Sequence, residues 1–432
     1  MAFGHLAGAV NNFFYWVTNP VWMGGTLVGT AIGGFIVFFH GGNDYGKAAY
    51  LAIGIPFIWL GVLFAVLSFR VGKWVATIGA YARFLLLGFF TIVVAVYGAK
   101  HGFHGISAGG FKPTYESFVL LVPLILFSLV GFELPSAAGE EMEDAKEDVP
   151  AGIAKSVLAT GLLYGLPVLG ILLVLPVGQA TGLAGFPDAI KQTLTVFGGH
   201  LTPAADGQVT SHLSTTGTVL GWAMAVLIAI VAFTSGLTWI MGSDRTLAVS
   251  CYDGAGPKYL GGFSARFGTP LRVNVLSGIV STAIFVATLY ITSGNAAKFF
   301  NVALALAIST TLISYLGIFP AAWKLRGQRP EDDSYRAPLL PLMTILSVAF
   351  VLFSTVEVLF PGLGDEWFGS DYRPDDWKPS EKWVYLFTEA VPLVLFTVIA
   401  VAFWAMGKRH RDTELSRLAE PMSASTVDPA GR

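Results

Sequence analysis

Apolar runs of about 20 residues recur along the whole chain, and this pattern constrains the fold more than any other feature. A helix of that length crosses the roughly 30 Å hydrocarbon core of a bilayer. The runs lack the two-residue alternation of membrane barrel strands. With 54% hydrophobic and 12% charged residues, against about 25% charged in soluble domains, the sequence predicts an all-α polytopic membrane protein.

The apolar runs predict about ten spans in one transmembrane domain, residues 1–412, followed by a disordered cytoplasmic tail at 413–432. The spans lie near 9–39, 48–69, 74–99, 115–143 (broken at 131–136), 151–176, 216–249, 271–292, 297–323, 339–360 and 384–406. Connections on one side carry about twice as many Lys and Arg residues as those on the other, which predicts that this side is cytoplasmic. We therefore expect a multi-pass protein of the plasma (inner) membrane with both termini inside the cell.

The fourth span contains a glycine, a carboxylate and a proline in close succession. Gly131, Glu133 and Pro135 interrupt the apolar run in "SLVGFELPSAAG". Transporters use such breaks to expose backbone N–H and C=O groups to a substrate, because irregular backbone at membrane depth persists only around a cavity. A glycine and a proline can also simply kink a helix. The buried carboxylate favours a functional site, since ionisable groups at that depth are costly.

Two motifs resemble those of the amino acid–polyamine–organocation (APC) permeases. "SLVGFELPSAAGEEMEDAKEDVPAGI" is similar to the family's sixth-helix signature, and "SDRTLAVSCYDGAGPKYLGGFSARFGTPLRVN" is similar to its loop after the eighth helix. The resemblance covers essentially the whole chain and is closest to bacterial amino acid permeases and glutamate/GABA-type antiporters. It implies a LeuT-type inverted-repeat fold. It also implies secondary active amino acid transport by alternating access, as proton-coupled symport or amino acid/amine exchange.

The resemblance also implies a departure at the start of the chain. "AFGHLAGAVNNFFYW" is similar to the junction between the family's second and third helices, so about ten of an expected twelve helices are present. We expect the first residue to be internal to a longer reading frame and the short form alone to be inactive. The alternative is a non-transporting, permease-derived membrane partner or sensor.

The resemblance assigns substrate-binding or gating roles to residues on several spans. These residues are Asn19, Phe127, Ser128, Gly131, Phe132, Trp239 and Ser309. Each has a structural alternative: aromatic side chains pack against lipid or other helices, Ser and Thr hydroxyls bond their own preceding carbonyls, and Asn19 can join two helices.

Coupling roles fall on two charged residues. Glu133 matches the family's buried carboxylate, as a proton acceptor or as a clamp on the broken backbone. Arg83 is the basic residue predicted inside a span, and it looks like the counterpart of a lysine found in some proton-coupled members. Because arginine does not readily lose its proton, Arg83 would supply fixed positive charge. The alternative is that Arg83 extends to the cytoplasmic interface.

Other chemistry is not indicated. His101 and His104 could form a metal pair, but we expect them to be solvent-exposed in an outer loop. The single Cys251 excludes an intrachain disulfide, and no nucleophile–base set or nucleotide motif is readable. We expect no enzyme activity, cofactor, metal or nucleic-acid partner. The expected partners are an amino acid, a proton or counter-substrate, and the lipid bilayer.

Overall fold

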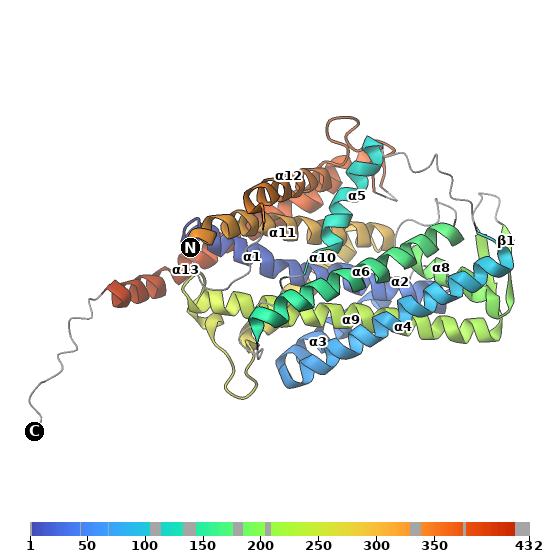
Figure 1. Ribbon diagram of the computed structural model, residues 1–432, viewed down its shortest axis with the longest axis horizontal. Helices are drawn as coiled ribbons and strands as arrows, with labels where there is room; N and C mark the ends of the chain where they lie inside the picture. The colour runs from blue at the N-terminus through green and yellow to red at the C-terminus, as the bar shows by residue number, and fades with distance from the viewer. Residues whose placement is uncertain are drawn as a thin grey trace, which may run out of the picture.

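The computed structural model is a bundle of long helices that run mostly along one axis (Figure 1). It describes residues 2–43, 45–67, 69–103, 114–131, 133, 144–175, 185–203, 209–328, 338–374 and 377–419. The helices are α1 (His5–Val21), α2 (Val28–Phe39), α3 (Lys47–Leu67), α4 (Phe69–His101), α5 (Tyr115–Ser128), α6 (Ala145–Val174), α8 (Gly185–Thr193), α9 (Thr215–Tyr252), α10 (Leu271–Ile291), α11 (Ala296–Leu325), α12 (Leu340–Leu359) and α13 (Lys382–Ala419). Short 3₁₀ turns lie at Leu194–Phe197, Lys258–Gly261, Arg326–Gln328 and Pro379–Glu381.

Nine stretches of helix within the described residues are long and apolar enough to cross a membrane. They coincide with nine of the predicted spans and confirm the all-α polytopic class. The remaining predicted span, 115–143, begins as the 14-residue helix α5, which ends at Ser128 before the turn 129–131. Pro135 and the rest of 134–143 lie outside the described residues. The predicted break therefore begins at Leu129, just before Gly131.

The most buried part of the bundle is a continuous helical rod formed by α1, a π-helical turn at Trp22–Leu27, and α2. Two glycines allow other helices to approach this turn closely. A Cβ atom at Gly24 would overlap the backbone carbonyl of Ser281 on α10, and one at Gly25 would overlap the Ala303 side chain on α11. Extra volume at such a contact forces the backbone apart, so the small residues set the spacing of three helices.

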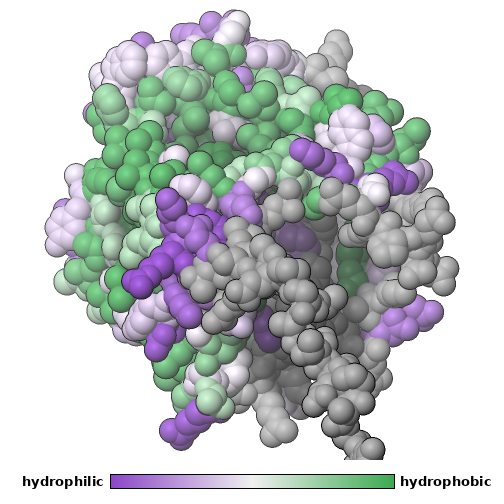
Figure 2. Space-filling model, turned by 90° about the vertical axis from the view of Figure 1, so that its left-hand side faces the viewer, coloured by the Kyte–Doolittle hydropathy of each residue, from purple (hydrophilic) through white to green (hydrophobic). Residues whose placement is uncertain are grey.

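The outer helices expose many large apolar side chains. Leu85 on α4, Leu158 on α6 and Val394 on α13 are each more than half exposed. Apolar patches of this extent are rare on soluble monomers, and in a membrane they face lipid. Figure 2 views the end of the bundle where the chain starts, and hydrophilic side chains gather over part of that end with hydrophobic ones beside them.

The start of α1 and the end of α13 lie at the same end of the bundle (Figure 1). There the loop after α9 packs on α13, because Arg411 donates a hydrogen bond to the Gly254 carbonyl at 2.8 Å. Gly254 has a φ of 83°, a conformation that favours glycine. Which end is cytoplasmic stays a prediction. Helix α13 continues to Ala419, into the predicted tail, and 420–432 lie outside the described residues, so the disordered tail also stays a prediction.

An antiparallel hairpin closes the opposite end of the bundle (Figure 1). Its strands are β1 (Gly199–Pro203) and β2 (Val209–Leu213), with His200 opposite His212. Helix α8 and the Leu194–Phe197 turn pack beside the hairpin. These elements form an ordered cap on the connection between α6 and α9.

Candidate functional site

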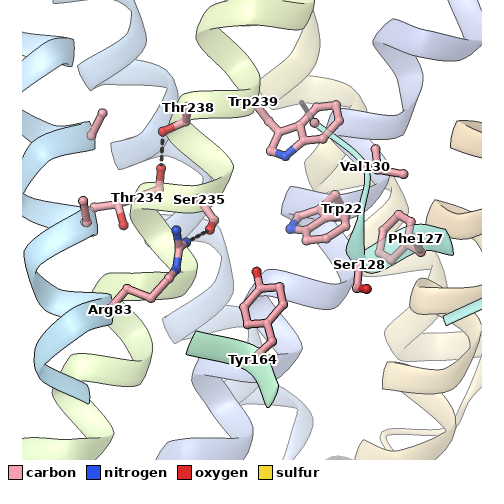
Figure 3. Close-up of a pocket in the computed structure, with 14 residues that line it drawn as sticks. Trp22, Arg83, Phe127, Ser128, Val130, Tyr164, Thr234, Ser235, Thr238 and Trp239 are labelled. Atoms are coloured by element: carbon pink, nitrogen blue, oxygen red, sulfur yellow. Dashed lines mark hydrogen bonds between the residues drawn. The ribbon is translucent and has the colours of Figure 1, made fainter. Parts of the chain in front are cut away.

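A cavity of about 350 Å³ lies between α4, α5, α6, α9 and the π-helical turn (Figure 3). Its lining residues are Trp22, Ala76, Gly79, Ala80, Arg83, Phe127, Ser128, Val130, Gly131, Tyr164, Thr234, Ser235, Thr238 and Trp239. The structure therefore brings five of the predicted site residues into one space: Arg83, Phe127, Ser128, Gly131 and Trp239. This volume is within the range of small-molecule sites.

One side of the cavity carries its charge. The Arg83 guanidinium on α4 donates a hydrogen bond to the Ser235 hydroxyl on α9 at 2.6 Å. In the described part of the chain no carboxylate forms an ion pair with Arg83. Arg83 thus turns toward a neighbouring helix and the cavity, as the coupling hypothesis requires, while its role stays a prediction.

Aromatic rings form the other side, opposite Arg83 (Figure 3). The centroid of the Trp22 ring lies 4.5 Å from that of Phe127 and 6.3 Å from that of Trp239, and the two indole rings are nearly parallel. Tyr15 approaches Trp239 at 6.1 Å from the α1 side. A row of rings facing a fixed cation can hold the ammonium group of a ligand by cation–π attraction.

Two hydroxyl groups on α9 bond the backbone of the helix, and a third bonds a side chain of the cavity. Thr234 and Thr238 donate to the carbonyls of Ile230 and Thr234, the local bonding that competes with a ligand role. Ser235 instead accepts from Arg83. Ser128, at the end of α5, donates to the Ile125 carbonyl at 2.7 Å. The hydroxyl oxygens keep acceptor capacity, and Ser235 is the one tied to the charged group.

The broken end of α5 brings backbone to the cavity. Helix α5 stops at Ser128, and Val130 and Gly131 line the cavity directly. Gly131 has a φ of 100°, which a residue with a side chain rarely adopts. The glycine thus permits the chain to leave the helix at this point and to carry Glu133 away from it.

Glu133 lies next to the cavity and is not one of its lining residues. The Tyr315 hydroxyl on α11 donates a hydrogen bond to Glu133 Oε2 at 2.7 Å. Tyr15 on α1 also interacts with the Glu133 carboxyl group. The carboxyl therefore joins the segment after α5 to two other helices, and Tyr15 connects it to the Trp239 ring.

The remaining predicted residues lie elsewhere. Asn19 and Ser309 are buried on α1 and α11, and neither lines the cavity. Their side-chain polar atoms find no hydrogen-bond partner among the described residues. The link between α1 and α11 is made instead by Thr18, which bonds Thr310 at 3.1 Å. Phe132 lies outside the described residues.

Several residues that the structure places at this site were not among the site residues predicted from the sequence. Trp22 and Tyr164 line the cavity, and Tyr315 bonds Glu133. An aromatic residue in an apolar run carries no signal of its orientation. Trp22 does stand at the start of a π-helical turn, and the adjacent Gly24–Gly25 pair was the readable hint of unusual packing.

The described ranges contain no further candidate metal site. No group of three or more His, Cys, Asp or Glu side chains there could hold an ion. His101 is exposed near the end of α4, and His104 lies outside the described residues. The site is one of aromatic, hydroxyl and guanidinium groups.

Comparison with known families decides the identity. The family described as amino acid permease matches residues 1–373. The chain belongs to the amino acid permease family. Membership, together with the apolar helices, confirms the LeuT-type transporter fold and secondary transport, and it does not favour the non-transporting alternative. The family consists of transporters of small molecules embedded in membranes.

Individual relatives of the permease differ in what they are described to carry. The permease is 25% identical to the "probable agmatine/putrescine antiporter AguD" of Lactococcus lactis subsp. lactis (strain IL1403), over 83% of this chain and 74% of that protein. It is 24% identical to the "branched-chain amino acid permease BcaP" of Bacillus subtilis (strain 168), over 66% of this chain and 54% of that protein. Among solved structures, an Eremococcus coleocola manganese transporter matches with a TM-score of 0.46 and 12% identity, over 94% of this chain and 82% of that one.

Proposed function

We propose that the permease binds an amino acid in the cavity between α4, α5 and α9 and carries it across the plasma membrane by alternating access. The observation that carries this proposal is the broken backbone at Val130–Gly131, which lines the same cavity as Arg83 and the aromatic rings. Irregular backbone beside a polar cavity is the device by which transporters bind substrates at membrane depth. The connections on the side of the two termini carry the excess of Lys and Arg residues, which supports a cytoplasmic location of both termini.

The charge of the cavity favours a zwitterionic substrate over a diamine. Arg83 provides a fixed cation that attracts the carboxylate of an amino acid. Trp22, Phe127 and Trp239 face it and accept the ammonium group. A dication such as putrescine would lack a partner for Arg83 and be repelled by it. By this argument the permease carries a substrate of the amino acid class and not of the diamine class.

Glu133 is the proposed proton-linked group. Its contacts with Tyr15 and Tyr315 join the segment after α5 to α1 and α11, so a change in its charge alters the contacts between these three segments. This favours proton-coupled symport. Exchange of one amino acid for a related amine is the alternative mode, and it needs no change of protonation.

Reconstitution into liposomes tests both parts of the proposal. Uptake of radiolabelled neutral amino acids is measured with and without an inward proton gradient, with putrescine and agmatine as competitors. We expect saturable uptake of at least one neutral amino acid, stimulation by the gradient, and weak competition by the diamines. Strong competition by putrescine would contradict the role of Arg83, and uptake driven only by amino acid inside the vesicles would identify exchange.

A further inference from the structure

A fully buried carboxyl group lies away from the cavity, at the junction of α1, α9 and α10. Asp244 on α9 has no exposed surface. Its Oδ1 atom accepts a hydrogen bond from the Trp16 indole at 3.0 Å and another from the Ser277 hydroxyl at 2.6 Å. The Trp16 indole also donates to the Ser277 oxygen at 2.9 Å. Asp244 is thus the centre of a three-residue cluster that joins three helices.

The hydrogen bonds of Asp244 are unevenly distributed. Both donors bind Oδ1, and within the described chain Oδ2 has no hydrogen-bond partner. An ionised carboxylate in an apolar interior needs donors or a cation at both oxygens. A protonated carboxyl group needs a donor at only one oxygen, because the other oxygen carries the proton and is itself a donor. The geometry therefore matches a carboxyl group that holds a proton on Oδ2.

A buried amide on α10 also has an oxygen without a donor among the described residues. Asn274 precedes Ser277 by one helical turn on α10 and is 2% exposed. Its Oδ1 atom has no donor within the described residues. A buried carbonyl oxygen without a donor is itself costly. Asp244 Oδ2 on α9 and Asn274 Oδ1 on α10 are thus two buried oxygens without a hydrogen-bond partner among the described residues.

Among the described residues no basic side chain forms an ion pair with Asp244. Arg245 follows it on α9, and the Arg245 guanidinium lies over the Phe263 ring, 5.8 Å from the centroid. Five of the charged or titratable side chains on the helices against α9 have contacts elsewhere: Tyr15 with Glu133, Lys47 over the Tyr290 ring, Arg83 with Ser235, Lys100 with the Val196 carbonyl, and Arg272 with the Tyr259 carbonyl. A proton is the simplest neutralising ion for this position.

The cluster is connected to the candidate site through adjacent residues of α1. Trp16 donates to Asp244, while Tyr15 interacts with Glu133 and approaches Trp239. A shift of α1 at Trp16 therefore moves Tyr15 as well. Glu133 and Asp244 are in this way linked through two adjacent residues of α1.

We propose that Asp244 is a second proton-binding site of the permease, and that its loading changes how α9 holds α1 and α10. The proton enters on Oδ2, and the hydrogen bonds from Trp16 and Ser277 to Oδ1 weaken as the negative charge disappears. Loss of the proton strengthens both bonds and draws the three helices together. The part of this proposal that concerns coupling rests on the proposed transport function, whereas proton binding does not.

Infrared spectroscopy of the purified permease tests proton binding without transport. The carbonyl stretch of a protonated buried carboxyl group is compared in wild type, Asp244→Asn and, as the matched control, Glu133→Gln. We expect a band that disappears in Asp244→Asn and persists in Glu133→Gln. In Ser277→Ala the same band should shift, because that hydroxyl donates to the carbonyl-like oxygen. If Asp244→Asn fails to fold, the shift in Ser277→Ala decides: an unchanged spectrum overturns the proposal.

The transport arm asks whether the proton at Asp244 moves with substrate. Asp244→Asn keeps the shape of the side chain but cannot exchange a proton, so uptake in liposomes should lose at least half of its dependence on a proton gradient. Ser277→Ala should move the midpoint of the pH profile upward, because it removes a donor to the ionised form.

A wild-type pH profile in both variants would overturn the coupling role. Replacement of the proton effect by a requirement for sodium would overturn the proton assignment. Infrared bands that behave as expected in a protein without any uptake would refute only the transport function.

Discussion

The Tyr315 hydroxyl donates a hydrogen bond to Glu133 Oε2 at 2.7 Å and so joins α11 to the segment that follows the broken end of α5. The two residues are far apart in the sequence, and the bond forms because Gly131 turns the chain out of the helix. Hydrogen bonds to a charged group are worth about 1.5–3 kcal/mol, more than bonds between neutral groups. Under the proposed function, protonation of Glu133 would weaken this contact between α11 and the segment after α5.

Glu133→Gln should keep the contact with Tyr315 while removing the exchangeable proton. We expect uptake in liposomes to lose part of its response to a proton gradient, with folding unchanged by size-exclusion chromatography. Tyr315→Phe removes the hydroxyl and should lower the uptake rate roughly ten-fold, since the bond is worth about 1.5–3 kcal/mol, while some pH response remains. A Glu133→Gln protein with the wild-type pH profile would show that Glu133 is not the proton-linked group.

Amino acid uptake should depend on both the charge and the shape of the side chain at position 83, and more strongly on the charge. Arg83→Ala removes the cation, and we expect amino acid uptake to fall at least ten-fold with little change in thermal stability. Arg83→Lys should retain part of the activity because the charge persists, although an ammonium group cannot reproduce the planar guanidinium. Equal uptake by all three proteins, measured at equal amounts in the vesicles, would mean that Arg83 serves neither substrate nor coupling.

Run length and charge were sufficient to predict the helical spans, because a bilayer leaves few ways to satisfy backbone polar groups. The break near Gly131 was also predictable, since glycine followed by proline is unusual in an apolar helix. The residues that line the cavity were harder to predict from the sequence. Asn19 shares a face of α1 with Tyr15 and Trp22 by helical spacing, yet Asn19 is buried against other helices and Trp22 forms the wall.

The contacts of Glu133 and Asp244 could not be derived from the sequence. Each depends on which residues of distant helices meet, and hydropathy does not encode that choice. Asp244 is the second residue of the quoted motif that begins "SDRTLAV", where an acidic residue resembles an ordinary helix-end charge. Only the packing of α1 and α10 shows it to be fully buried.

Trp22 should contribute more to binding than its apolar character suggests. Trp22→Ala removes the ring that lies between Phe127 and Trp239, and we expect the apparent affinity for substrate to fall roughly ten-fold, about the value of a cation–π contact plus ring packing. Trp22→Phe should be milder. Trp222 is the matched control, because it is 45% exposed on α9 outside the cavity. A Trp222→Ala variant with the same loss as Trp22→Ala would indicate a general folding effect.

Gly24 should be required for the packing of the bundle and not for the chemistry of the site. A methyl group at Gly24 would overlap the Ser281 carbonyl, and overpacking of this kind costs about 1–3 kcal/mol. Gly24→Ala should therefore lower the melting temperature in detergent, whereas Gly161→Ala on α6, where a Cβ atom meets nothing within 4 Å, should leave it unchanged or raise it slightly. Ser281 presents backbone at the contact, so a smaller side chain there cannot relieve the clash. If Gly24→Ala is as stable as Gly161→Ala, α10 is not held as closely to the π-helical turn as the structure places it.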